Sequence, residues 1–290
     1  MRSRRLYGWT AWHLCGGVAL FLGAIAVHLN AWQDIVRFAM HDEEASHIWL
    51  VPIVSVWLIW VRMDRFRHCR PGPSWVGPAM MACGWLIGTV GYYNALQAFW
   101  HGGAVLVAAG SIVTIAGRDL LLRFAPAFAV LVFLVPVPGM MRQQIAIPLQ
   151  TATASVTQVA FEILGVPIDR TGNVLGINGV DVAIAEACNG MRMVFALLLV
   201  SYGFAFGTLL RNYVRLLIIV ASPLSAIFCN VIRLLPTVWL YGYYPNNVAE
   251  KFHDVSGWLM LPVAFVILMA IIRLLRWALI PVAPYTLAYE

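Results

Sequence analysis

Long apolar stretches with few or no charged residues recur along the whole chain. A helix that crosses a bilayer needs about 20 predominantly apolar residues, with a workable range of roughly 17–25. The sequence therefore predicts an all-α polytopic membrane protein with about eight transmembrane helices, organised as a single integral-membrane domain over residues 1–290. The eight stretches, some of which include flanking residues, are 10–29, 45–61, 75–93, 99–117, 120–139, 188–210, 214–241 and 257–275.

The composition of the chain agrees with a membrane location. Charged residues make up 11% of the sequence and mean hydropathy is +0.80, whereas soluble domains carry about 25% charged residues. The first apolar stretch, 10–29, is too long for the core of a signal peptide and lacks a clear small-residue cleavage site. We therefore expect this stretch to stay in the protein as a membrane anchor.

The basic residues are distributed unequally between alternate connecting segments. With the N-terminus placed in the cytoplasm, 13 of the 19 basic residues fall in inner segments, whereas ten of the 13 acidic residues fall outside. Because cytoplasmic connections carry an excess of basic residues, both termini are expected in the cytoplasm. The net charge of +6 then reflects topology in a lipid environment, and no nucleic-acid partner is expected. The inner arginines are at positions 2, 4, 5, 62, 65, 67, 70, 118, 123, 211, 215, 273 and 276.

Residues 143–161 form a charge-free segment that is too polar to be a convincing span. Its apolar residues recur at alternating steps of four and three, which is typical of an amphipathic helix. We expect a non-spanning outer helix, either at the membrane interface or in a groove between other helices. The apolar positions are Ile145, Leu149, Ala152, Val156, Val159 and Ile163.

The next segment carries a hairpin signal. Asn178 and Gly179 form a preferred two-residue turn and are flanked by β-branched residues. The sequence predicts a small outer β-hairpin that ends directly at Cys188, so that the outer helix and hairpin together occupy about 140–187. The hairpin would serve as a connector, as a lid, or as an edge to which an extended peptide adds as a strand.

The cysteine spacing excludes several kinds of site. Five cysteines, at positions 15, 69, 83, 188 and 229, form no CxxC pair and no Cys/His metal spacing. We therefore expect no disulfide framework, no bound metal and no cofactor. A membrane disulfide carrier is disfavoured for the same reason.

One of these cysteines stands directly before a long apolar helix. The surrounding residues, Glu186-Ala-Cys188-Asn189-Gly-Met-Arg192, place the thiol at the expected N-terminus of the stretch 188–210. Free N–H groups at a helix N-terminus lower a thiol pKa from its ordinary value near 8.5, and Arg192 on the same helical face adds a positive charge. A nucleophilic thiolate is the chemical interpretation, whereas a lone cysteine in an apolar chain is more often a small buried side chain.

Helix counting brings two further ionisable residues to the outer side. Arg233 lies near the outer end of the seventh predicted span, and His253 lies just before the eighth. From Cys188 to Arg233 the chain crosses inward and returns, because each helix of about 20 residues rises about 30 Å. Ionisable residues within apolar spans cost roughly 2.5–3.5 kcal/mol on insertion scales, so each requires an explanation.

A thiol, a guanidinium and an imidazole at one membrane depth suit acyl transfer. The Cys188 thiolate would attack a carbonyl, His253 would act as acid and base, and Arg233 would stabilise the oxyanion. Arg192 or Asn189 would assist or bind an acidic group of the substrate, and Asn230, one turn before Arg233, would orient it.

Each of these residues also has a plain structural interpretation. Arg233 would reach the outer headgroups or pair with an acid, and Asn230 would form a hydrogen bond between helices. Cys229 is expected to be a packing residue. His253 would be an ordinary loop histidine, as we expect for the other six, at positions 13, 28, 41, 47, 68 and 101.

Three blocks of the sequence resemble the signature motifs of the exosortase/archaeosortase family. They are Glu186-Ala-Cys188-Asn-Gly-Met-Arg192, Asn230-Val-Ile-Arg233 and His253-Asp254-Val-Ser-Gly257, and the similarity covers roughly residues 45–275. The ordered set of three blocks is specific to that family, although Asn189 stands where serine is more often expected.

The resemblance implies a function and a location. Family members are multi-pass inner-membrane cysteine transpeptidases that process secreted proteins bearing a C-terminal tail of a short motif such as Pro-Glu-Pro, a membrane helix and a basic cluster. By that resemblance Cys188 is the nucleophile, Arg233 the stabiliser and His253 the acid/base, with Glu186, Asn189, Arg192, Asn230 and Asp254 in supporting roles. The implied location is the bacterial inner membrane, with catalytic spans at about 188–275 and the active site at the periplasmic face.

Two other classes of function are compatible with the composition. A transporter would use Arg192 and Arg233 to bind an anion or lipid-linked substrate at broken helices. A non-catalytic subunit of a surface-polymer export assembly would need no reactive thiol. The clustering of ionisable residues at one side rather than the midplane, and the absence of a visible internal repeat, favour the enzyme.

Overall fold

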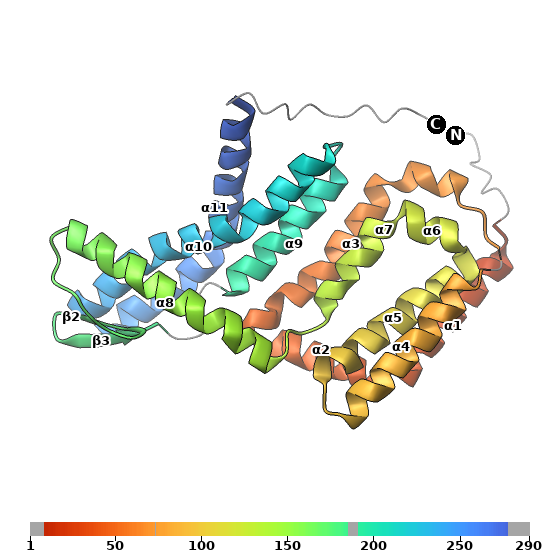
Figure 1. Cartoon of the computed structure of the whole chain (residues 1–290), viewed down its shortest axis with the longest axis horizontal. Coiled ribbons are helices and arrows are strands. Elements are labelled where there is room, and N and C mark those ends of the chain that lie inside the picture. Colours follow the sequence, from red (N-terminus) through yellow and green to blue (C-terminus); the bar gives the residue numbers. More distant parts are fainter. Residues whose placement is uncertain (1–8, 73, 185–190, 278–290) are drawn as a thin grey trace. The chain divides into compact units, whose positions relative to one another are not determined.

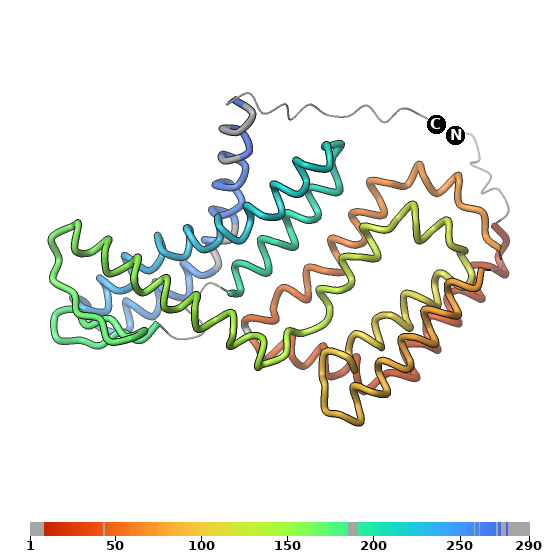
Figure 2. The backbone as a smooth tube through the Cα atoms, viewed as in Figure 1, coloured from red at the N-terminus to blue at the C-terminus, as the bar shows by residue number. Residues whose placement is uncertain are grey.

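Residues 9–72, 74–184 and 191–277 are described by the computed structural model, whose backbone is traced in Figure 2. Their contacts divide the chain into two units, Met1–Pro138 and Gly139–Glu290. Both units are helical, and the described part of the second unit adds a small antiparallel sheet. Each unit is described by itself below.

The first unit is built around the helix α5. Eleven of its 20 residues are buried, and α1, α2 and α4 pack against it. Ile35 and Ala39 of α2 share a buried cluster with Val105 of α5 and with Ile48 of η1. The elements of the unit are α1 (Ala11–Val27), α2 (Leu29–His41), η1 (Glu43–Trp49), α3 (Leu50–Val61), η2 (Met63–His68), α4 (Val76–Tyr93), α5 (Gln97–Ala116), α6 (Arg118–Arg123), α7 (Ala125–Ala129) and η3 (Val130–Leu134).

Glycines bring α4 and α5 into close contact. A Cβ added to Gly103 of α5 would lie 2.5 Å from the carbonyl oxygen of Gly84 and 2.5 Å from the Cα of Gly88, both on α4. Small residues at such positions let two helix backbones approach closely, which is how many helices associate in membranes. The α4–α5 pair therefore depends on the missing side chain at Gly103.

Replacement of Gly103 by alanine should destabilise the first unit by about 1–3 kcal/mol, because the new methyl group overlaps backbone that cannot move alone. Thermal unfolding in detergent would measure this loss. The adjacent Gly102→Ala is the matched control, since its Cβ would meet only a side-chain atom of Val135 at 3.8 Å. Equal midpoints for the two variants would contradict the packing argument.

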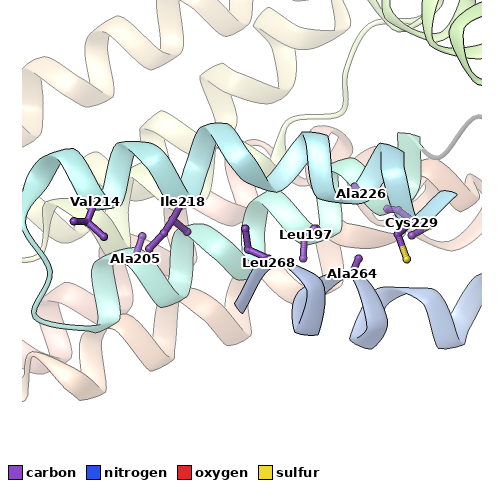
Figure 3. Packing of buried hydrophobic residues seen from close by; sticks show 9 residues of the cluster. Leu197, Ala205, Val214, Ile218, Ala226, Cys229, Ala264 and Leu268 are labelled. Atoms are coloured by element: carbon purple, nitrogen blue, oxygen red, sulfur yellow. The ribbon is translucent and has the colours of Figure 1, made fainter. Parts of the chain in front are cut away.

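The second unit combines the helix α8, a three-stranded sheet and three helices that pack on each other (Figure 1). Residues of α9, α10 and α11 form its largest buried cluster, in which Leu197, Ala226 and Ala264 come from the three different helices (Figure 3). Both α9 and α11 run antiparallel to α10. The elements are α8 (Gly139–Ile163), β1 (Asp169–Thr171), β2 (Val174–Ile177), β3 (Val180–Ala183), α9 (Met191–Gly207), α10 (Asn212–Tyr243) and α11 (Asn246–Trp277).

The predicted hairpin is present and is extended by one strand. Asn178 and Gly179 form the β2–β3 turn with φ values of 50° and 77°, the left-handed region that this kind of turn requires. A second two-residue turn at Gly172 and Asn173 adds β1, so that the order is β1-β2-β3 with both pairs antiparallel. Leu175 and Ile177 of β2 are fully buried in a cluster with Leu234 and Val238 of α10.

The helix predicted at 143–161 is present as α8, and its buried side carries polar residues. Gln150, Thr153 and Thr157 are buried together with Ala154 and Phe161, and the helix packs against α10 and the sheet. The predicted apolar stripe faces outward instead: Ile145, Val156, Val159 and Ile163 are all exposed. The stripe is therefore not buried in a groove of its own unit, and it suits contact with lipid.

The described helices confirm a polytopic membrane architecture, and the number of spans predicted from the sequence stays a prediction. Three helices are long and apolar enough to cross a membrane, or up to six if each bent pair counts as one span. The predicted span 120–139 is not one continuous helix, because it is divided into α6, α7 and η3. The three helices are Glu44–Val61, Gln97–Ala116 and Asn212–Tyr243, and the bent pairs involve α1 with α2, Ala125–Leu134 with α8, and the two parts of α11.

Candidate functional site

Two polar residues of the second signature block are buried in the second unit. Asn230 is fully buried and Arg233 is 4% exposed, both on α10 and one turn apart. Pro236 interrupts the hydrogen-bond ladder just beyond them. The hydroxyl of Thr237 donates 2.8 Å to the Arg233 carbonyl. A buried guanidinium in an apolar chain is costly unless its charge is used or compensated.

The helix α11 lies against α10 at the position of Arg233. The Nη1 atom of Arg233 is 3.4 Å from the point that a Cβ would occupy at Gly257. One turn further along, the Cys229 thiol donates to the carbonyl of Met260 at 3.6 Å. These two contacts define an antiparallel pairing in which the Arg233 guanidinium lies next to Gly257.

His253 comes to the same region because it lies four residues before Gly257. Residues four apart on a helix share a face and are separated by about 6 Å along the axis. His253 is partly buried, and its Nδ1 atom is 3.6 Å from the Asp254 carboxylate, whose side chain is 81% exposed. The structure thus brings Arg233 and His253, which are 20 residues apart in the sequence, within about one helical turn of each other on neighbouring helices.

Three of the predicted site residues, Glu186, Cys188 and Asn189, lie outside the described residues. The described chain on either side of them is well anchored: Ile184 belongs to the buried cluster that contains Leu234, and Met191 is 1% exposed at the start of α9. Arg192 is half-buried in the first turn of α9. Both flanks of the thiol segment therefore belong to the same unit as Arg233.

The other cysteines have different surroundings. Cys229 is fully buried in the α9–α10–α11 cluster, which confirms its predicted packing role. Burial raises the pKa of the Cys69 thiol above its ordinary value, with Arg123 opposing and Asp119 adding to that shift. Cys15 and Cys83 are exposed on the apolar helices α1 and α4.

The prediction that the remaining histidines are ordinary loop residues is wrong for His47, which is 5% exposed within η1, and for His101. His101 lies in α5, is fully buried, and its Nε2 atom is 3.0 Å from the Asp34 carboxylate of α2. Sequence spacing gave no sign of this pair, because its members are 67 residues apart and meet only through the packing of α2 on α5. His101 and Asp34 belong to the first unit, whereas Arg233 and His253 belong to the second.

An apolar pocket of about 500 Å³ also lies in the first unit. Its lining contains no ionisable side chain and no cysteine, and its one hydroxyl, on Ser55, donates 3.0 Å to the carbonyl of Ala127. Such a lining suits an apolar chain and offers no group for chemistry. Within the described part of the protein, no three His, Cys, Asp or Glu side chains are placed to hold a metal ion.

The geometry around Arg233 suits the stabilisation of negative charge. A guanidinium stays protonated under all ordinary conditions, and it interacts strongly with an anion where water is excluded. The imidazole of His253 on the neighbouring helix adds a group that can accept and donate a proton. Gly257, which the sequence motif contains, has a clear spatial role only once its contact with Arg233 is known.

Comparison with known proteins identifies the family. A search of curated proteins and a search of solved structures each find no match to the chain. A family model described as transmembrane exosortase matches residues 32–270, a range that contains all three signature blocks and confirms the expected resemblance. At the level of the family this means a multi-pass membrane protein and a sorting transpeptidase that acts on secreted proteins with sorting tags. The chain belongs to the transmembrane exosortase family.

Proposed function

We propose that this protein cleaves the C-terminal sorting tail of secreted proteins through a thioester on Cys188, at the periplasmic face of the bacterial inner membrane. The observation that carries the proposal is the buried Arg233 guanidinium against Gly257, with His253 one turn away. Cys188 lies four residues after Ile184, which shares a buried cluster with Leu234, and three residues before the start of α9. Four residues of chain span at most about 14 Å, which limits how far Cys188 can lie from Ile184.

The proposed reaction has two steps, acylation of Cys188 and transfer of the acyl group to an acceptor. The Cys188 thiolate attacks the scissile carbonyl, and Arg233 stabilises the tetrahedral oxyanion. The C–N bond then breaks, His253 donates a proton to the departing amine, and the thioester remains. An amine of an acceptor, or water by default, then attacks the thioester, His253 takes the proton of that nucleophile, and Cys188 leaves as the thiolate.

The remaining residues of the motifs support these groups. Asn230 lies one turn before Arg233 on the same face of α10 and orients its guanidinium. Asp254 lies beside His253, with its carboxylate 3.6 Å from the Nδ1 atom. Arg192 and Asn189 assist the oxyanion or bind an acidic group of the substrate, and Glu186 belongs to the same motif.

The length of α10 supports the proposed depth of the site. Arg233 is 21 residues from the start of α10, a rise of about 32 Å, which matches the hydrocarbon core of about 30 Å. Beyond it, Trp239 and Tyr243 stack at 4.5 Å, and such aromatic residues are enriched at the membrane–water interface. With the N-terminal end of α10 at the cytoplasm, as the arginine distribution predicts, Arg233 reaches the outer boundary.

The substrate tail fits the same orientation. Its basic cluster would be held in the cytoplasm by the charge rule that orients the enzyme, and its hydrophobic helix would lie beside the spans. The short motif before that helix then emerges at the level of Arg233. Transpeptidation and hydrolysis share the thioester, so both follow from the same geometry.

The direct test is to trap the intermediate. The full-length enzyme is mixed with a reporter protein that ends in a short Pro-Glu-Pro motif, a hydrophobic helix and a basic cluster, and the reaction is acid-quenched for mass spectrometry. We expect the acyl part of the reporter on the peptide that contains Cys188. Cys69 serves as an internal control, because its raised thiol pKa keeps it protonated at neutral pH. Tail cleavage without an adduct on Cys188, or with one on another cysteine, would overturn the assignment.

A further inference from the structure

The strand β3 is an edge strand, and its register with β2 determines which of its backbone N–H and C=O groups face outward. The Ile184 amide donates to the Asn173 carbonyl at 2.9 Å, and the β2–β3 register pairs Leu175 with Val182 and Ile177 with Val180. Hydrogen-bonded and non-hydrogen-bonded pairs alternate along an antiparallel ladder. The N–H and C=O groups of residues 180, 182 and 184 therefore point toward β2, whereas those of Asp181 and Ala183 point to the outer edge.

The outer edge of β3 is accessible. Asp181 and Ala183 are both exposed, and among the described residues no backbone hydrogen bond of a turn or loop uses their N–H or C=O groups. At the opposite edge, Arg170 of β1 donates to the side chain of Ser155 and to the carbonyl of Thr151 on α8, a helix that contacts both β1 and β2. Within the described residues, the β3 edge offers its outward N–H and C=O groups to another strand.

The usual protection of an edge strand is weak at β3. Natural proteins shield free edges with charged side chains, prolines, bulges or covering elements. The one charged side chain of β3, Asp181, has its Oδ1 atom 3.3 Å from the point that a Cβ would occupy at Gly176 of the neighbouring strand. Its carboxylate therefore lies over the exposed face of the sheet, toward β2, and leaves the outward edge open.

The edge leads directly to the proposed nucleophile. Ala183 ends β3, and Cys188 follows five residues later, a distance of at most about 18 Å along the chain. The buried face of the sheet is held on α10 by Ile184, Leu234 and Val238, so the edge and Arg233 belong to one packed assembly. A peptide lying along β3 would have its next few residues within reach of both groups.

From this arrangement we infer that the β3 edge binds the secreted substrate in an extended conformation, as an added strand next to the scissile bond. This inference rests on the proposed function of Cys188. Asp181 and Ala183 each contribute one N–H and one C=O, so two alternate residues of the substrate pair with them. Main-chain pairing of this kind tolerates many side chains, and specificity then comes from the groups beside the strand.

The test removes the outward donor without disturbing the sheet. Proline at position 183 eliminates the N–H that points to the edge, and proline is tolerated in edge strands at such positions. We expect Ala183→Pro to lower the rate of reporter processing about tenfold, through loss of a backbone bond and obstruction by the ring. The matched variant Ala183→Val changes the side chain and keeps the N–H, so it should process the reporter faster than Ala183→Pro. Labelling of Cys188 by iodoacetamide should be equal in all three proteins.

A second experiment does not depend on the folding of a variant. Synthetic peptides carrying the reporter motif are N-methylated at one residue at a time and offered to the wild-type enzyme. Pairing with β3 predicts that cleavage is impaired at every second position and retained at the positions between them.

The outcomes separate the two proposals. Wild-type processing by Ala183→Pro, or N-methyl effects without a period of two, would overturn strand addition and leave Cys188 as the nucleophile. If Ala183→Pro loses iodoacetamide labelling as well as processing, the peptide series decides. Absence of the Cys188 adduct would overturn the proposed function itself.

Discussion

Cleavage of the tailed reporter should fall by about 10⁴-fold or more when Cys188 is replaced by alanine, because removal of a nucleophile abolishes the covalent pathway and leaves only binding and charge stabilisation. Reporter and product are resolved by gel electrophoresis after co-expression, and single-turnover rates are measured in detergent with purified enzyme. The loss should appear in the chemical step, with reporter binding little changed.

The matched control for this variant is Cys229→Ala in the same unit. Cys229 is fully buried among α9, α10 and α11, and the smaller side chain leaves only a minor cavity, so processing should persist. Undiminished processing by Cys188→Ala would remove the thioester mechanism.

Replacement of Arg233 by glutamine should lower kcat by about 10²–10³-fold, the range measured when a donor to a developing oxyanion is removed. Glutamine keeps a polar group at this buried position and loses the charge. Because the proposed interaction forms in the transition state, KM for the reporter should change little. A merely structural role would instead lower the thermal midpoint and the amount of folded enzyme.

Two further variants test whether the effect of Arg233→Gln is specific to this position. Arg233→Lys keeps the charge and loses the planar set of donors, so about a tenfold loss is expected. Arg215 lies 18 residues earlier on the same helix, about 27 Å away, and its guanidinium covers the ring of Phe206. The kcat of Arg215→Gln should therefore be close to that of the wild type. Equal losses for Arg233→Gln and Arg215→Gln would indicate a general effect of charge on α10 rather than a role in the reaction.

Local features of the fold were predictable wherever a short segment carries its own conformational signal. The turn at Asn178 and Gly179 was predicted because these two residues adopt positive φ readily, and the structure confirms it. The additional strand β1 has the same kind of signal, because Gly172 and Asn173 also form a two-residue turn between short strands.

The apolar stripe of α8 shows where periodicity stops being informative. Alternating steps of three and four identify a helix with two faces, and they do not say which face meets protein when lipid is also present. Here the polar and small side contacts α10 and the sheet, whereas Ile145, Val156 and Val159 face outward. In water the opposite choice would be favoured, because only there does burial of apolar side chains drive packing.

The candidate site was likewise predictable only in part from the sequence. Its residue types and their order along the chain were evident from three motifs, and the family match over residues 32–270 agrees with them. The burial of Arg233, its contact with the backbone at Gly257 and the resulting approach of His253 follow only from the antiparallel packing of α10 on α11. No spacing along the sequence contains that information, since it depends on the rotation of two helices about their axes.

By itself the sequence determined that this chain is a helical membrane protein with a two-residue turn before a cysteine motif, because hydropathy, turn propensity and motif order are properties of neighbouring residues. Tertiary structure alone decided which side of α8 is covered, that His101 is buried against Asp34, and that the edge of β3 is open. Each of these depends on contacts between residues far apart in the chain, whose energies are settled by packing and by the medium on each face rather than by local preference.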